Sequence, residues 1–195
     1  MGTVTFSNHY KYQLSNKAVN VTSDTIKALL VKSGFVFDPD TYATRTNMKA
    51  TTGSATLVFA NTGSTITRPT GSFITDGFVV GNYITSTASL NPGPFTVTAV
   101  AALILTVEDT LVNETISCVL TADDELETEF GYTQDAKTIT TPALSEDDTD
   151  DRAEFTCDNI AWTAAGGNIG PTPGVILVDD TTSDDTIICY LDLGT

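Results

Sequence analysis

His9 is the only histidine in this chain of 195 residues, and it is therefore the first candidate for a general base. A catalytic triad needs a nucleophile beside the base and a third group that orients the base. No Ser or Cys partner for His9 is evident in the sequence. Carboxylates are abundant, but no spacing forces two of them together as an acid–base pair. We therefore expect a protein with no catalytic residues, which is not an enzyme.

Two acidic runs have the residue types that calcium prefers, which are clustered carboxylates with backbone carbonyls. They are "SEDDTDD" (Ser145–Asp151) and "DDTTSDD" (Asp179–Asp185). Neither has the twelve-residue loop pattern with a central Gly and a terminal Glu, so we predict solvated hairpin tips instead. "GGNIGPTPG" (Gly166–Gly174) lacks the Lys and the following helix of a phosphate-binding loop, and we predict a strand connection there. We expect no metal and no cofactor.

The three cysteines are widely spaced and odd in number. They are Cys118, Cys157 and Cys189. This pattern argues against a disulfide framework, and the lack of a CxxC pair argues against a zinc site. We predict buried free thiols, which suits synthesis in a reducing cytoplasm. The N-terminus lacks the apolar run of a signal peptide, and no stretch approaches the ~20 apolar residues of a membrane span, so we expect no membrane association.

The formal net charge of −16 is unevenly distributed. Residues 1–50 hold six bases and three acids, a net +3, so residues 51–195 carry −19. Nucleic-acid binding rests on Lys and Arg that neutralise phosphates. A surface this acidic repels a phosphate backbone, and we expect no nucleic-acid partner.

Short apolar or β-branched runs separated by turn residues indicate an all-β protein. Between Thr52 and Leu120 the expected strands are Ala55–Phe59, Thr65–Arg68, Asn82–Thr87, Pro94–Val100, Leu103–Val107 and Ile116–Leu120. This spacing is typical of a small barrel or sandwich of about seventy residues. In the C-terminal part they are Lys137–Leu144, Ala153–Trp162, Gly174–Asp180 and Thr186–Leu193.

Two assignments have alternatives. Thr25–Val31 is expected to be a strand, although Ser23 or Asp24 could instead cap a helix that carries Ile26, Leu29 and Leu30. Four aromatic residues in the central segment fit a buried core better than a sugar-binding face. They are Phe73, Phe78, Tyr83 and Phe95.

Four segments of the sequence are notable for their order and spacing: "SNHYKYQLSNKAVNVTSDTIKALLVKSGFVFDPDTYAT", "GYTQDAKTIT", "AEFTCDNIAWTAAGGNIGPTPGVILVDD" and "IICYLDLG". Together they resemble a group of tailed-bacteriophage virion proteins of the head decoration or minor structural type. The match covers residues 7–44 and 130–194. It implies a discontinuous β-sandwich-like domain from residues 1–51 and 124–195. An inserted β module, residues 52–123, would interrupt that domain, as loops with neighbouring ends permit.

The resemblance implies a capsid decoration or cement protein on the virion surface. Its partners would be the major capsid protein and neighbouring copies of itself, in a homo-oligomer on the virion. The slightly basic N-terminal segment would dock on an acidic shell surface, with Lys11 and Lys17 as the docking residues. The alternative is a tail- or fibre-associated module whose inserted domain binds the host surface.

Overall fold

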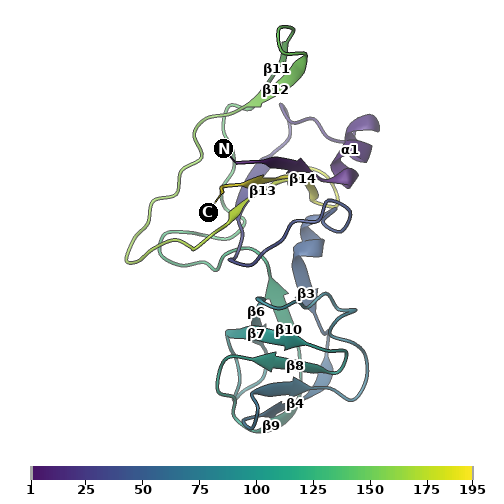
Figure 1. The fold of residues 1–195 in the computed structure, drawn as a ribbon, viewed down its shortest axis with the longest axis vertical. Helices are drawn as coiled ribbons and strands as arrows, with labels where there is room; N and C mark the ends of the chain where they lie inside the picture. The colour runs from purple at the N-terminus through teal and green to yellow at the C-terminus, as the bar shows by residue number, and fades with distance from the viewer. Residues whose placement is uncertain (1, 195) are drawn as a thin grey trace. The chain divides into compact units, whose positions relative to one another are not determined.

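The computed structural model describes residues 2–194 and consists mainly of antiparallel strands (Figure 1). The predicted all-β class is confirmed. The chain divides into two compact units: one is formed by Met1–Asn47 with Glu125–Thr195, here called the base, and the other by Met48–Asp124. The predicted boundaries, residues 52 and 123, lie inside the second unit. No helix among residues 2–194 is long and apolar enough to cross a membrane.

The base contains a four-stranded antiparallel sheet in the order β1 (Val4–Phe6), β14 (Thr186–Asp192), β13 (Gly174–Asp179) and β2 (Ile26–Leu30). β2 forms at the segment where a helix was the alternative, and the strand prediction is correct. Every residue of β13 is buried, which explains its continuous apolar run. Val175 pairs with both Leu30 and Leu191, so apolar side chains from three strands share one face.

The one α-helix within residues 2–194 is α1 (Asn8–Ser15), which follows β1 and was not predicted. Ser7 caps it: the extended backbone of this buried residue lets its Oγ accept hydrogen bonds from the backbone N–H of His9 (3.2 Å) and Tyr10 (3.4 Å). No residue of α1 is fully buried, which is why no apolar helical period marks it in the sequence.

The second unit is an eight-strand sheet in the order β3 (Lys49–Thr51), β10 (Leu120–Asp123), β6 (Tyr83–Ser86), β7 (Phe95–Val100), β8 (Ile104–Val107), β5 (Thr65–Thr67), β4 (Ala55–Ala60) and β9 (Glu114–Cys118). The strands at one end of this order, β3 and β10, are connected along the chain to the strands at the other end, because β3 leads into β4 and β9 leads into β10. The sheet therefore closes into a small barrel, which removes free edges. A short 3₁₀ helix, η1 (Arg45–Met48), precedes β3.

The interior of the barrel is apolar, and its side chains come from residues that are paired across neighbouring strands. Phe59 pairs with Ile66, and Ile66 pairs with Leu105, so three neighbouring strands place fully buried side chains side by side. Among the four aromatics expected in the core, Phe73, Phe78 and Phe95 are buried. Tyr83 is 42% exposed, and its assignment to the core is wrong, because it occupies the outward position of β6 next to buried Ile84.

A separate hairpin is formed by β11 (Ala143–Asp147) and β12 (Arg152–Thr156). The predicted strands Lys137–Leu144 and Ala153–Trp162 overlap it only in part. Residues 157–173 form a long connection instead, which contains two prolines and three glycines that interrupt strand pairing. The acidic run Ser145–Asp151 ends at the hairpin tip, as predicted.

Candidate functional site

Lys11 and Lys17, the residues expected to dock, lie on α1 and just after it, and both are exposed. Among residues 2–194, every other Lys or Arg except Lys137 has an acidic side chain within ion-pair distance. Lys137 Nζ instead donates to the carbonyl oxygen of Ala161 at 2.7 Å. Lys11 and Lys17 are therefore the exposed cations among residues 2–194 that have no acidic side chain within ion-pair distance, and Lys11 Nζ donates instead to Asn8 Oδ1 at 2.9 Å.

Exposed apolar side chains adjoin these cations. Tyr12 is 62% exposed and Leu14 is 50% exposed on α1. On β1, Val4 and Phe6 are 51% and 45% exposed, and Phe6 stacks on Tyr10 of α1 with ring centroids 5.7 Å apart. We call the six residues of this surface the N-terminal face. They are Val4, Phe6, Lys11, Tyr12, Leu14 and Lys17.

β1 is also an open sheet edge. It pairs with β14 on one side, with Thr5 opposite Tyr190, and no strand among the described residues pairs with its other side. An open edge with apolar side chains can accept a strand or hairpin from another protein. The sequence predicted the two lysines of this surface but not its apolar members, because neither the helix nor the edge position of β1 has a local sequence signal.

α1 is held on the base by a polar contact with the turn before β14. His9 Nε2 lies 2.9 Å from Asp184 Oδ2, and Thr186 Oγ1 donates to Asp184 Oδ1 at 2.8 Å. Burial raises the pKa of the Asp184 carboxyl, but hydrogen bonds from Thr186 and His9 outweigh it, so the pKa lies below its usual range. The ring of His9 thus orients a helix, and among the described contacts it meets no Ser or Cys nucleophile.

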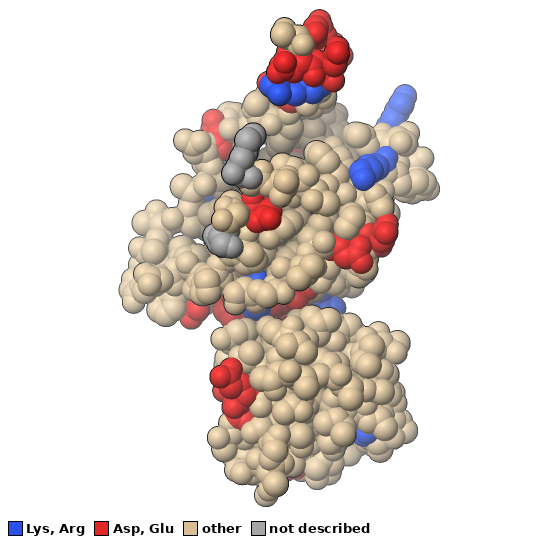
Figure 2. Space-filling view, viewed as in Figure 1, with Lys and Arg blue, Asp and Glu red and all other residues tan. Residues whose placement is uncertain are grey.

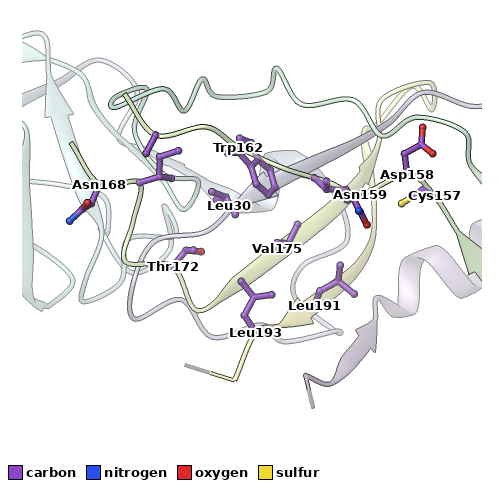
Figure 3. Close-up of a pocket in the computed structure, with 13 residues that line it drawn as sticks. Leu30, Cys157, Asp158, Asn159, Trp162, Asn168, Thr172, Val175, Leu191 and Leu193 are labelled. Carbon is purple, nitrogen blue, oxygen red and sulfur yellow. The ribbon is translucent and has the colours of Figure 1, made fainter. Parts of the chain in front are cut away.

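An apolar groove of about 840 Å³ lies on the base, in the size range of ligand sites (Figure 3). Leu30, Val175 and Leu191 of the sheet form its floor, and Trp162 from the long connection lies across it. The indole N–H of Trp162 is buried without a hydrogen-bond partner among the described residues. Its polar lining is divided: Asp158 and Asn159 lie at one end of the groove and Asn168 at the other (Figure 3).

The cysteines are free in the structure. Cys118 and Cys189 are buried as predicted, and burial raises the pKa of Cys189 to about 12. Cys157 is only partly buried and lines the groove, so the prediction of a buried thiol is wrong for this residue. Its strand ends at Thr156, which leaves Cys157 outside the sheet.

The acidic side chains do not converge on one point. Among residues 2–194, no group of three or more His, Cys, Asp or Glu side chains has the arrangement of a metal site. At the hairpin tip, Arg152 forms ion pairs with Asp147 (3.3 Å), Asp150 (3.2 Å) and Glu154 (2.7 Å). Figure 2 shows this tip as a dense cluster of acidic atoms.

No protein-family model, no curated protein and no solved structure matches this chain.

Proposed function

We propose that this chain is a non-enzymatic structural protein of a tailed-bacteriophage virion, which decorates the outer capsid shell and docks there through its N-terminal face. One observation carries the proposal: in a chain of net charge −16, the unpaired cations Lys11 and Lys17 adjoin exposed apolar side chains and an open strand edge. The resemblance in residues 7–44 and 130–194 supplies the virion context.

Each part of the face would contribute differently to docking. The two lysines attract an acidic shell surface and raise the association rate, an effect that salt screens. The apolar side chains of α1 and β1 supply burial, at ~25 cal/mol per Å² of apolar surface. A protein that spans the seam between shell subunits resists their separation, and the capsid then ruptures at a higher temperature.

The first experiment is the copy number of the chain per purified virion, measured by quantitative mass spectrometry against the major shell protein. Hundreds of copies, at a simple ratio to the shell protein, support decoration. A few copies per particle place the chain at the tail or portal, and absence from the particle refutes a virion role.

The second experiment measures binding of the purified chain to stripped heads across a salt series. Lys11→Ala/Lys17→Ala should weaken binding and flatten its salt dependence, because two cations are lost from the contact. Lys49→Ala is the matched control, since this exposed lysine lies in the barrel, 3.9 Å from Asp123. Equal binding by the wild type, the double variant and the control at every salt concentration would exclude the two lysines from docking. A separate measurement tests cementing, which equal rupture temperatures of stripped and decorated heads would exclude.

One observation favours the alternative, a host-surface binding module. The barrel loop before β6 exposes three aliphatic side chains, Ile74 (59%), Val79 (49%) and Val80 (61%). Saturable binding of the full chain to host cells, lost in Ile74→Ser/Val80→Ser but kept in Lys11→Ala/Lys17→Ala, would support this function over decoration.

A further inference from the structure

The hairpin β11–β12, here called the arm (residues 143–156), pairs with no other strand of the described chain. It forms a two-stranded sheet of its own, and every residue of both strands is exposed or half-exposed. An isolated two-stranded hairpin is at best marginally stable in water, because it buries too little apolar surface to offset its ordering entropy. The arm would therefore gain stability from a surface that covers one of its sides.

The arm carries both apolar and acidic groups for such a contact. Leu144 and Phe155 are direct cross-strand partners, 58% and 37% exposed, and form an apolar spot on the hairpin. Six acids and one base lie in residues 143–156, a net charge of −5. Arg152 pairs with three of the acids, whereas Glu146, Asp148 and Asp151 have no ion pair among the described residues.

The complementary surface in the same chain is the N-terminal face. It provides Lys11 and Lys17, the exposed cations without an acidic partner, beside exposed Tyr12 and Leu14. No hydrogen bond or ion pair among the described residues joins the arm to α1 of its own copy. Within the base, the arm projects beyond the four-stranded sheet, and α1 lies at the end of β1 (Figure 1). Figure 2 likewise shows basic side chains over α1, apart from the acidic cluster of the arm.

We propose that the arm of one copy binds the N-terminal face of a second copy, with acids on lysines and the Leu144–Phe155 pair on the apolar residues of the face. The contact joins two different surfaces, so it is head-to-tail, and each copy keeps one free arm and one free face. Such contacts build open chains or closed rings rather than isologous dimers. The inference rests on the proposed function in that it uses the same face: a neighbour's arm and the acidic shell compete for it.

Sedimentation of the purified full chain over a concentration series tests the proposal. In about 50 mM salt we expect the average mass to rise with concentration above that of one copy. In about 500 mM salt we expect the association constant to fall by about tenfold or more, since the Debye length shortens from ~14 Å to ~4 Å. A wild-type chain of constant single-copy mass at every concentration in low salt overturns the proposal.

A charge swap tests the pairing itself. Lys11→Glu/Lys17→Glu gives a copy with two acidic surfaces, and Glu146→Lys/Asp148→Lys places two lysines on the arm and reduces its net charge from −5 to −1. Each variant alone should be monomeric, and a one-to-one mixture should regain association, because the glutamates of the altered face can pair with the lysines of the altered arm. The control Glu108→Lys/Glu129→Lys makes the same charge change as the arm variant at exposed positions elsewhere, and it should associate at least as strongly as wild type. Association of either swapped variant alone at wild-type strength, or no recovery in the mixture, overturns the pairing.

The shell assay separates this inference from the proposed function. If the wild-type chain binds stripped heads but stays monomeric in solution, the arm contact is refuted and decoration stands. If the wild-type chain self-associates and the charge-swap variants associate only when mixed, but the chain does not bind heads, decoration is refuted and the arm contact stands. If both hold, Glu146→Lys/Asp148→Lys should bind heads more tightly than wild type, because its arm no longer competes.

Discussion

Arg45 and Glu125 form a buried ion pair, with Arg45 Nη2 2.5 Å from Glu125 Oε2, at the two ends of the segment that forms the barrel. Tyr132 O–H donates to Glu125 Oε1 at 2.6 Å, and the backbone N–H of Asp135 donates to the same oxygen at 2.8 Å. The N–H of Leu30 in β2 donates to the Tyr132 hydroxyl at 3.0 Å. The chain leaves the base after Asn47 and returns to it at Glu125, and we call these two places the crossing points. The network connects both crossing points to the sheet of the base.

Breaking this pair should strongly destabilise the base. Glu125→Gln or Arg45→Met should each lower the free energy of unfolding by about 3–5 kcal/mol. Arg45→Met leaves the buried Glu125 carboxylate without this cation, and Glu125→Gln leaves the buried guanidinium with the more exposed Asp135 carboxylate, 3.2 Å from its Nε. The double variant Arg45→Met/Glu125→Leu should cost less than the sum of the two single changes. Urea unfolding followed by the fluorescence of Trp162, the only tryptophan, reports on the base.

Arg152→Met is the control for this series. The ion pairs of Arg152 are exposed on the arm, so we expect this change to lower the free energy of unfolding by no more than about 1 kcal/mol. A loss for Glu125→Gln as small as that of Arg152→Met would show that the buried pair does not hold the crossing points.

Asp179 should make the base more stable in mild acid. Its side chain is fully buried, and Oδ2 has no hydrogen-bond partner. Burial and the nearby Asp24 carboxyl raise its pKa to about 6. Between the unfolded pKa of ~3.9 and this value, the folded state binds more protons than the unfolded state, so the contribution of Asp179 to stability falls as pH rises through that window.

Asp179→Asn removes this ionisation and keeps the oxygen that accepts from the N–H of Thr181. We expect it to raise the free energy of unfolding at pH 7 by about 1–3 kcal/mol and to leave little difference from wild type at pH 4. Parallel urea unfolding at both pH values gives the comparison. A variant less stable than wild type at pH 7 would show that the ionised carboxylate is stabilised in the fold.

Loss of the α1 cap should weaken the N-terminal face without unfolding the base. Ser7→Ala removes the oxygen that accepts from the N–H of His9 and Tyr10, and it should cost about 1 kcal/mol, because these donors lose their partner. Ser15→Ala is the control, since the exposed Ser15 hydroxyl bonds only to the carbonyl oxygen of Lys11 at 3.0 Å. Hydrogen exchange at α1 should rise in Ser7→Ala alone, and equal exchange in the two variants would contradict the capping role.

The three thiols should differ in reactivity. Cys157 lines the open groove and should react with a thiol reagent in the native protein, whereas buried Cys118 and Cys189 should react only on unfolding. Burial raises the pKa of all three thiols, so the rate at Cys157 should increase with pH up to and beyond 9. Counting modified thiols by mass spectrometry gives the result, and Cys157→Ser, with no fast-reacting thiol left, is the control.

The strand content and most strand positions follow from local signals in the sequence. β-Branched runs such as Val175–Val178 favour strands, and the Gly and Pro residues between such runs end them. The same local signals located the acidic tip of the arm and identified Lys11 and Lys17 as cations in an acidic chain.

The contacts of those residues depend on the three-dimensional fold. α1 depends on one capping side chain and on its contact with Asp184, 170 or more residues away along the chain. No helical periodicity of apolar residues in the local sequence therefore predicts it. The exposure of Tyr83 and Cys157, the open edge of β1 and the pairing of Arg45 with Glu125 depend on which distant segments pack together. Burial and ion pairing are properties of neighbours in space, and in this chain those neighbours come from segments that are far apart in the sequence.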